Sequence, residues 1–426
     1  MPCPACLVYS LLYELSEKMK INNSPRVRRD LEFFPVMHGN DQLIVVRDQL
    51  GLVEEGKAVA LPLYELMTLL DGTNTARDIQ MILMRQGGGV LIGMDEVERL
   101  TAYLDESYFL ESERYLQARD KIVAEFSEIK VRPCSHCGIS YPDHAVDLKK
   151  SLDEIINTQP YVPEPEGSVS ALIAPHIDLS VGTRVYGSAY QWVKHTSPSR
   201  IVVLGVGHKM MGDLFSLTEK DFETPLGKVK NDRGLVRKLR EAGHSVISDN
   251  DFVHKAEHSL EFQVIFLQHL LAQDSFTIIP ILCGPVMASI SDCTRQTYLE
   301  KATPFLKVLS EIMHEEGEET LLVAGVDFSH IGPKFGHDMP ATHIESQSEK
   351  HDQNLLKAVS EGEADEFWEE SSRVGDRFNV CGFSAMACLM EVIPPSKGRV
   401  LNYQCWHEEA TRSAVSFAAV VFLKNP

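Results

Sequence analysis

Five near-continuous apolar runs in the C-terminal two thirds of the chain constrain its fold most strongly. They are rich in β-branched residues and are separated by amphipathic stretches such as GLVRKLREAG and LEFQVIFLQHLLAQ. Strands that are apolar on both faces belong in a sheet covered by helices on both sides. The pattern therefore predicts an α/β domain with a largely parallel or mixed central sheet flanked by helices. The predicted strands lie within residues 168–176, 200–208, 276–284, 320–330 and 416–424.

The N-terminal part of the chain has a different pattern. Short mixed strands are expected within residues 30–60, and helical periodicity follows at 63–71, 75–86 and 94–110. This order predicts a small α+β, winged-helix-like domain. The segment LLDGTNTARDIQ resembles the small peptide-recognition winged helices related to the pyrroloquinoline-quinone chaperone. A helical cap on the larger domain is the alternative. We therefore divide the chain into an N-terminal segment (1–27), a winged-helix-like module (28–118), a linker helix (119–131) and the α/β domain (132–426).

Charge and apolar content exclude several function classes. The 61 acidic and 41 basic residues give a formal net charge of −20, which disfavours binding to nucleic acid or to an anionic membrane. No apolar run approaches the roughly 20 residues needed to span a bilayer. The first twenty residues lack a basic start and are interrupted by Glu14 and Glu17, so we do not expect a signal peptide. Nine cysteines, several close to histidines, indicate reduced thiols in the cytoplasm.

Polar residues follow three of the predicted strands directly. His176 and His208 end the first two runs, and Asp327 and His330 end the fourth. Because ligands bind beyond the carboxyl ends of strands in open α/β sheets, these side chains are expected to meet in one crevice. One histidine at the end of a strand is usually structural, but its repetition on three strands favours a site.

Two further segments supply candidate site residues. His258 and Glu261 open an expected amphipathic helix and, three residues apart, share one of its faces. A helix-capping arrangement is the alternative for this segment. Cys381 precedes another apolar helix, where the helix N-terminus would favour the thiolate over the thiol. A buried, inert cysteine is the alternative there.

With these motifs in order, residues 132–426 resemble the Memo family, specifically the AmmeMemoRadiSam system protein B group. The matching segments are RPCSHCGISYP, LIAPHIDLSVG, VVLGVGHKM, TPLG, EHSLEFQVIFLQ, FTIIPILCG, DFSHIG and NVCG. The resemblance implies a fold similar to class III extradiol dioxygenases, which are non-haem iron enzymes. It also implies a metal held by two histidines and one cysteine.

Carried over to this sequence, the resemblance assigns the ligands to His176, His208 and Cys381. Asp327, His330, His258 and Glu261 would line the pocket as catalytic acid/base or supporting residues, with Asp327 or Glu261 fixing the tautomer of a proton-relaying histidine. The sequence departs from the family at two motifs. Pro-His-Ile-Asp-Leu, with Asp178, stands where many members have Pro-His-Ala-Gly-Tyr, and Val206-Gly207 replaces a common Pro-Ser before His208.

The expected function is that of a non-haem, metal-dependent redox protein acting on a small-molecule or peptide substrate. Imidazole and thiolate ligands favour iron (Fe²⁺), with copper or zinc as alternatives. The family's name implies an association with a radical SAM enzyme and an AMME-type protein. The alternative is a non-catalytic metal- or peptide-binding protein that uses the same crevice. Metal-assisted hydrolysis is disfavoured, because a thiolate ligand is uncommon in that chemistry.

Two Cys-x-x-Cys pairs, Cys3/Cys6 and Cys134/Cys137, have the spacing of metal-binding knuckles. Together they could form a four-cysteine zinc site, and Cys134/Cys137 alone could act as a redox dithiol. Independent thiols are the expected state.

Overall fold

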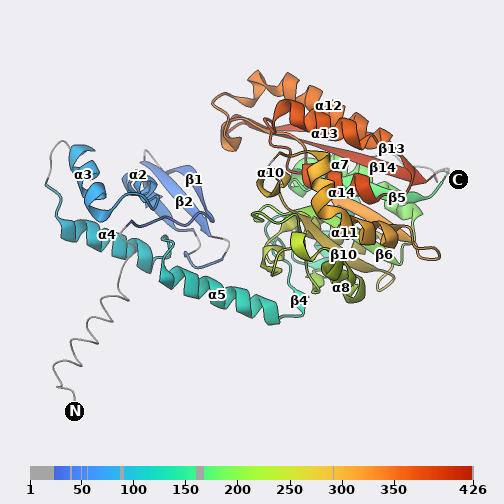
Figure 1. Ribbon diagram of the computed structural model, residues 1–426, viewed down its shortest axis with the longest axis horizontal. Helices are drawn as coiled ribbons and strands as arrows, with labels where there is room; N and C mark the ends of the chain where they lie inside the picture. The colour runs from blue at the N-terminus through green and yellow to red at the C-terminus, as the bar shows by residue number, and fades with distance from the viewer. Residues whose placement is uncertain are drawn as a thin grey trace, which may run out of the picture. The chain divides into compact units, whose positions relative to one another are not determined.

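The computed structural model describes residues 24–38, 41–48, 50–54, 56–86, 91–159, 167–290 and 292–424. The chain forms two compact units, residues 1–128 and 129–426 (Figure 1). The first unit ends with the helix α5 (Glu113–Glu128). This helix begins earlier than the linker helix expected at 119–131, because the Ser112 side chain accepts a hydrogen bond from the Tyr115 amide and starts the helix there.

The N-terminal unit combines a small antiparallel sheet with helices, as its sequence predicts. The strands pair in the order β1, β2, β3 and cover Leu31–His38, Asp41–Asp48 and Ala58–Ala60. The helices α2, α3 and α4 cover Leu61–Leu69, Ala76–Gln86 and Met94–Glu106. The last strand ends at Ala60, since Pro62 lies in the first turn of α2. Strand residues such as Ile44 and Val59 pack with Leu66 and Leu104 in one apolar core.

Four neighbouring parallel strands form the centre of the large unit. In spatial order they are β5 (Val169–Ala174), β11 (Thr320–Gly325), β6 (Arg200–Val206) and β10 (Thr277–Cys283). Each lies inside an apolar run in which a buried strand is predicted. The strand β14 (Ser413–Lys424) pairs antiparallel with β5, so the sheet is mixed.

The remaining strands extend this sheet to eleven described strands. β13 (Ser396–Glu408) forms a hairpin with β14. Most of its residues are half-exposed or exposed, so its sequence contains no apolar run from which the strand could be predicted. The shorter strands complete the edges of the sheet. They are β4 (Val131–Arg132), β7 (Phe215–Leu217), β8 (Asp221–Thr224), β9 (Gly227–Asn231) and β12 (His330–Ile331).

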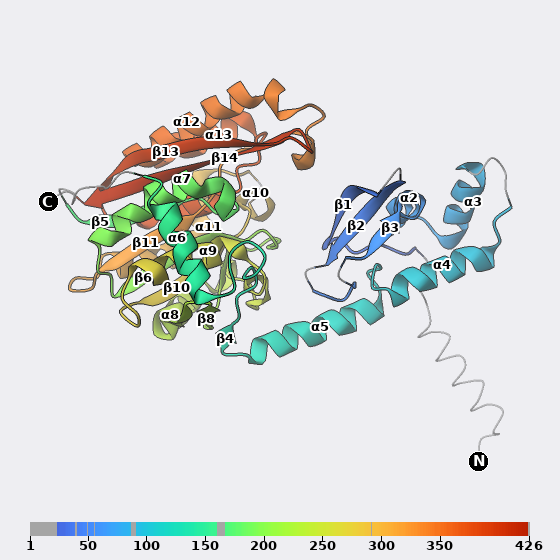
Figure 2. The same cartoon turned by 180° about the vertical axis from the view of Figure 1, so that it is seen from behind.

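Helices cover both faces of the large sheet, so alternate strand residues belong to different cores (Figure 2). Ile201 and Val203 face the core shared with α6 (Ala145–Ile156), α7 (Leu179–Tyr190) and α9 (His258–Leu270). Val202 and Leu204 face the opposite core, to which most of the other helices contribute. These are α8 (Arg233–Ala242), α10 (Val286–Ser289), α11 (Arg295–Met313), α12 (Glu345–Glu361), α13 (Ala364–Val374) and α14 (Phe383–Val392). Short 3-10 helices cover Gln191–His195, His244–Val246, Phe252–His254, Pro333–Phe335 and Ala341–His343.

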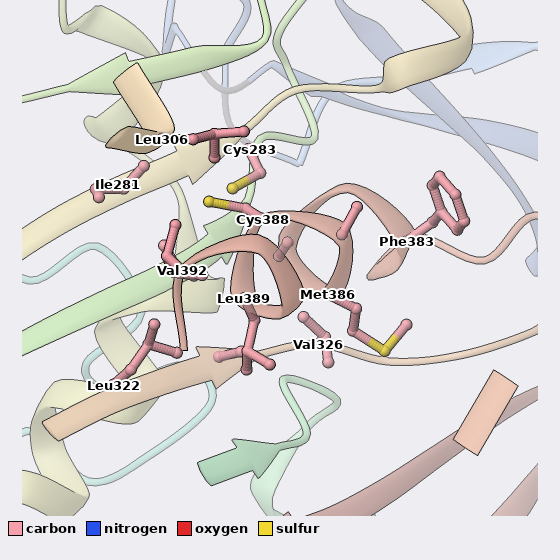
Figure 3. Packing of buried hydrophobic residues seen from close by; sticks show 14 of the residues in the cluster. Ile281, Cys283, Leu306, Leu322, Val326, Phe383, Met386, Cys388, Leu389 and Val392 are labelled. Atoms are coloured by element: carbon pink, nitrogen blue, oxygen red, sulfur yellow. The ribbon is translucent and has the colours of Figure 1, made fainter. Parts of the chain in front are cut away.

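The helices α9 and α14 are more deeply buried than amphipathic helices are. In α9 every residue from Ser259 to Leu267 is buried, which differs from the amphipathic helix expected there. Figure 3 shows Cys388 and Leu389 of α14 pointing into the core, with the sulfur of Cys388 beside that of Cys283. Both helices are therefore rigid supports for the residues at their N-terminal ends.

The structure corrects the expectation of independent thiols at Cys134/Cys137, which form a disulfide with Cα atoms 5.9 Å apart. The turn between them brings the two residues together, because the amides of Ser135 and His136 both bind the carboxylate of Glu261. The pair Cys3/Cys6 lies outside the described residues. No helix in the described ranges combines the length and apolar character needed to cross a bilayer.

Candidate metal centre

Two histidines and one cysteine meet at the carboxyl ends of neighbouring parallel strands. His176 follows β5 and His208 follows β6, and β11 lies between these strands. Cys381 arrives from the turn that precedes α14. One potential ligand atom from each residue lies within 4.8 Å of the other two, and Cys381 Sγ is 3.5 Å from His176 Nε2. The three side chains could therefore hold one metal ion.

Hydrogen bonds orient both histidines for ligation through Nε2. His176 Nδ1 lies 2.9 Å from the Gly325 carbonyl oxygen, and His208 Nδ1 lies 3.1 Å from both carboxylate oxygens of Glu257. Because these oxygens only accept, Nδ1 donates in each case, and Nε2 of the neutral ring keeps its lone pair. Histidine ligands in metal sites are commonly held in this way by a carbonyl or a carboxylate. The residues present thus fit a metal with mixed nitrogen and sulfur ligation.

Asp327, two residues after the end of β11, contacts two of the candidate ligands. Its Oδ1 accepts a hydrogen bond of 3.0 Å from the His176 amide, and its Oδ2 is 3.6 Å from His176 Nε2. Its carbonyl oxygen accepts from the Gly382 amide at 3.1 Å and lies 3.6 Å from Cys381 Sγ. Asp327 is 2% exposed, so its position is fixed by these bonds. The structure therefore places Asp327 as a residue that positions His176 and Cys381.

The electrostatic surroundings of Cys381 differ from those expected at a helix N-terminus. Burial and the charge of Asp327 raise the pKa of the Cys381 thiol well above its usual value, and hydrogen bonding to the backbone of Asp327 only partly opposes this. Without a cation the sulfur is thus a protonated thiol. The expectation of a thiolate stabilised by the helix is wrong for this state, because desolvation outweighs the partial charge of the helix terminus.

His258 packs against both candidate histidine ligands. Its ring centroid lies 5.2 Å from that of His176 and 5.1 Å from that of His208, with which it stacks at an interplanar angle of 10°. Its Nδ1 is 3.4 Å from Glu257 Oε1. Burial lowers the pKa of His258 to about 3, and the charge of Glu257 only partly compensates. His258 is therefore neutral near neutral pH.

His330 lies on the Asp327 side of the cluster. Its Nδ1 is 2.9 Å from the Phe328 carbonyl oxygen, which fixes the tautomer and leaves Nε2 as an acceptor. Burial lowers the pKa of His330 to about 4 against the opposing effect of Asp327. The tautomer of His330 is thus set by a backbone carbonyl, and the carboxylate that contacts His258 is that of Glu257, whereas the sequence suggested Asp327 or Glu261 for this role.

Glu261 faces away from the three candidate ligands. Its carboxylate accepts hydrogen bonds from Arg132 Nη1 at 2.6 Å and from Tyr141 Oη at 2.5 Å, together with the amides of Ser135 and His136. Burial would raise its pKa, but Arg132 and these donors lower it to about 2. Glu261 therefore anchors the loop of Cys134 and Cys137 against α9. The structure does not bring it to the metal cluster.

Two residues of the site escaped sequence reasoning. Glu257, the N-cap of α9, holds His208 and also accepts a hydrogen bond from the Ser259 amide at 2.9 Å. Its position immediately before His258 was a signal, since buried histidine ligands need a carboxylate or carbonyl partner. The second is His136, which lies between Cys134 and Cys137 and whose ring lies 5.3 Å from that of His258. No sequence periodicity links these two residues, which are 122 positions apart.

Comparison with known proteins shows the family to which the chain belongs. A family model described as Memo-like protein matches residues 132–421, which include all of the ligand candidates. The chain belongs to the Memo family. A MEMO1 family protein of Aquifex aeolicus is 31% identical over 405 residues, 93% of this chain and 99% of that protein. A MEMO1 family protein of Thermus thermophilus is 28% identical and covers 78% of this chain and 94% of its own.

Asp178, at which this Memo-family chain departs from the motif of many members, has a structural role. Its Oδ1 accepts hydrogen bonds from the Ser180 amide at 2.9 Å and from the Ser180 hydroxyl at 2.6 Å. It is thereby the N-cap of α7. The residue at this position therefore starts the helix that follows His176.

Proposed function

We propose that the chain is a metal-dependent redox protein whose metal ion is held by His176, His208 and Cys381. The convergence of three donor atoms within 4.8 Å, on histidines already oriented by acceptors at Nδ1, carries this proposal. Two imidazoles and a thiol favour Fe²⁺, with copper or zinc as alternatives. When bound, such an ion would supply one-electron chemistry and an open coordination position for a small-molecule or peptide-borne substrate.

The surrounding residues would handle protons beside that position. His258 and His330 are neutral because burial lowers their pKa values, so each offers an unprotonated ring nitrogen to a substrate hydroxyl or water, although the same low pKa values make both rings weak bases. Glu257 would stabilise His258 after protonation, since its Oε1 is 3.4 Å from Nδ1 of that ring. Asp327 would keep His176 and Cys381 in place throughout. The class of enzymes that the family resemblance implies is that of the non-haem iron dioxygenases.

Metal analysis of anaerobically purified protein tests the centre. The wild type should contain about one equivalent of redox metal at this site, and Cys381→Ser should lose it. Cys293→Ser, which alters another partly buried thiol, is the matched control and should keep the metal. Equal metal in the wild type and Cys381→Ser would overturn the proposal. Oxygen uptake by loaded protein with catechols would support a dioxygenase; a loaded protein without uptake would favour a metal- or peptide-binding role.

We also propose that the N-terminal unit recruits a peptide or a protein partner to this centre, in the cytoplasm. Five of the seven cysteines in the described residues are free thiols, which favours a reducing compartment, whereas the Cys134–Cys137 disulfide does not. The radical SAM enzyme and the AMME-type protein implied by the family name are the proposed partners, and the winged-helix resemblance is the basis for assigning recognition to this unit. Crosslinking the full chain to a purified radical SAM partner would test it. Crosslinks within residues 24–128 support the proposal, whereas crosslinks confined to residues 129–424 contradict it.

A further inference from the structure

A second group of different metal-ligating side chains lies outside the centre described above. Glu345 is the first residue of α12, while Cys405 and His407 lie two positions apart on β13 and so point to the same face of that strand. One potential ligand atom of each residue lies within 4.8 Å of the other two. His407 Nε2 is 3.1 Å from Glu345 Oε2. Two elements that are far apart in sequence thus bring a thiol, an imidazole and a carboxylate together.

This cluster is separate from the first centre. It shares no residue with His176, His208 and Cys381. The strand β14 also lies between β13 and β12, the strand that begins with His330. Any cation held by Glu345, Cys405 and His407 would therefore occupy its own site.

The three side chains of this cluster differ in exposure: Cys405 packs against apolar residues, whereas His407 and Glu345 are accessible to solvent. Cys405 is partly buried against the apolar cluster that contains Ile344 and Phe378. The side chain of His407 is 44% exposed and that of Glu345 is 32% exposed. A hydrated cation can therefore reach the imidazole and the carboxylate from solvent, while the sulfur supplies a ligand from the protein side.

The charges around Cys405 are predominantly negative. Burial and then the carboxylates of Glu345, Asp352 and Glu349 raise the pKa of its thiol to about 12. The Asp352 carboxylate already accepts hydrogen bonds from Ser329, Tyr403 and Ser416. Glu345 and Glu349, one turn apart on α12, remain near the thiol. A divalent cation would offset this repulsion and allow the thiol to release its proton.

We propose that Glu345, Cys405 and His407 form a second site for a divalent cation of the Zn²⁺ type, which fastens the first turn of α12 to β13. Sulfur, nitrogen and carboxylate oxygen are the three ligand types that zinc uses in proteins, and water would complete a tetrahedral arrangement. Mg²⁺ and Ca²⁺ are poor candidates because they prefer oxygen ligands only. On binding, the thiol proton passes to solvent and the sulfur bonds to the cation without any change in oxidation state.

Cobalt(II) titration of apo protein tests this site, because a Co²⁺–thiolate bond gives a charge-transfer absorption that nitrogen and oxygen ligands do not give. The titration uses Cys381→Ser combined with Cys3→Ser and Cys6→Ser, and every variant of this test is made in that background. It removes the thiol of the first centre and the N-terminal Cys-x-x-Cys pair. The buffer is anaerobic and contains no reductant, so that the Cys134–Cys137 disulfide persists. We expect one equivalent of thiolate-bound Co²⁺. Adding Cys405→Ser should abolish the band, and adding His407→Gln, an exposed substitution, should weaken Co²⁺ binding at least tenfold.

Cys293→Ser in the same background is the matched control and should leave the band unchanged. A second measurement uses Zn²⁺, which should raise the midpoint of thermal unfolding of Cys381→Ser and have no such effect once Cys405→Ser is added. The proposal is overturned if Cys381→Ser shows no thiolate band, or if the band survives Cys405→Ser. Either result leaves the first centre untouched, because that centre is tested by Cys381→Ser alone.

Discussion

Glu257 and Glu261 are buried carboxylates one turn apart at the start of α9. Replacing Glu257 by glutamine should weaken metal binding, whereas replacing Glu261 by glutamine should lower the stability of the fold. Glu257 holds His208 through Nδ1, with both oxygens 3.1 Å from that nitrogen. A hydrogen bond to a charged group contributes about 1.5–3 kcal/mol and a neutral one about 0.5–1.5 kcal/mol. Glu257→Gln should therefore weaken metal binding by about 1–2 kcal/mol, which is about 5- to 30-fold.

Glu261→Gln should instead lower stability and leave metal binding within about twofold. Its Oε1 accepts from Tyr141 and the His136 amide, and its Oε2 accepts from Arg132 and the Ser135 hydroxyl. The NH₂ group of the glutamine would replace either Oε1 or Oε2, and in both positions it would face hydrogen-bond donors. In addition, Arg132, whose side chain is 1% exposed, would lose its counter-charge. Breaking a buried ion pair from one side costs about 3–5 kcal/mol.

Two assays separate these effects. Competition with a chromophoric Zn²⁺ chelator, in a Cys405→Ser background that removes the second proposed site, measures affinity at the first centre. Urea unfolding followed by tryptophan fluorescence measures stability, and it reports the large unit alone because Trp192, Trp368 and Trp406 all lie there. The reasoning is refuted if Glu257→Gln binds Zn²⁺ as tightly as its parent, or if Glu261→Gln weakens binding to a similar extent.

Three further predictions concern protons and packing. Metal affinity should rise as the pH increases through and above 6.5. Burial lowers the pKa of His208, but Glu257 and Asp327 together raise it by more, and protons compete with the metal for that ring. Chelator competition at several pH values measures this, and a flat profile would contradict it. The pKa of Glu261 is lowered from 4.5 to about 2, so its contribution to stability is complete above pH 4.5 and is lost as the pH falls toward 2; acid titrations of urea unfolding should show this component in the wild type and not in Glu261→Gln. A Cβ on Gly325 would lie 2.4 Å from the Ser259 carbonyl oxygen, so Gly325→Ala should cost about 1–3 kcal/mol and release metal. Gly234→Ala is the control, because Gly234 is an exposed residue of α8 and a Cβ there would have its nearest contact at 3.5 Å. This variant should lower neither the stability nor the metal content.

The sequence predicts the centre of the large sheet well because its strands are apolar on both faces. The runs around Ile173, Val203 and Val323 identify β5, β6 and β11, and the mixed sheet is confirmed by the antiparallel β14. The half-exposed strand β13 was missed, since its burial depends on α12 and β14 and not on its own composition. The sequence of a single segment does not show which other elements cover it in the fold.

The candidate site divides in the same way. Histidines at strand ends could be placed together, because parallel neighbours deliver their carboxyl ends to one edge. Glu261 could not be placed, because Arg132 and Tyr141, which lie 129 and 120 residues away in the sequence, decide the side of α9 on which its carboxylate is stabilised. The three-residue spacing from His258 did not suffice to place Glu261 at the metal centre. Because α9 is buried on all sides, a side chain on any of its faces can find a bonding partner.

The two carboxylates of α9 also differ in how their charge is compensated, and this difference bears on the metal. Glu261 faces Arg132, a permanent cation, so its charge is balanced in the protein alone. Glu257 faces His208, whose pKa it raises, whereas Asp327 faces main-chain amides and His176, whose ring is neutral because burial lowers its pKa. Buried charge without compensation is costly. A cation at Nε2 of His176 and His208 would supply the compensation and make Nδ1 a stronger donor to Glu257. We therefore expect metal binding to stabilise the large unit, with Glu257 carrying part of the coupling.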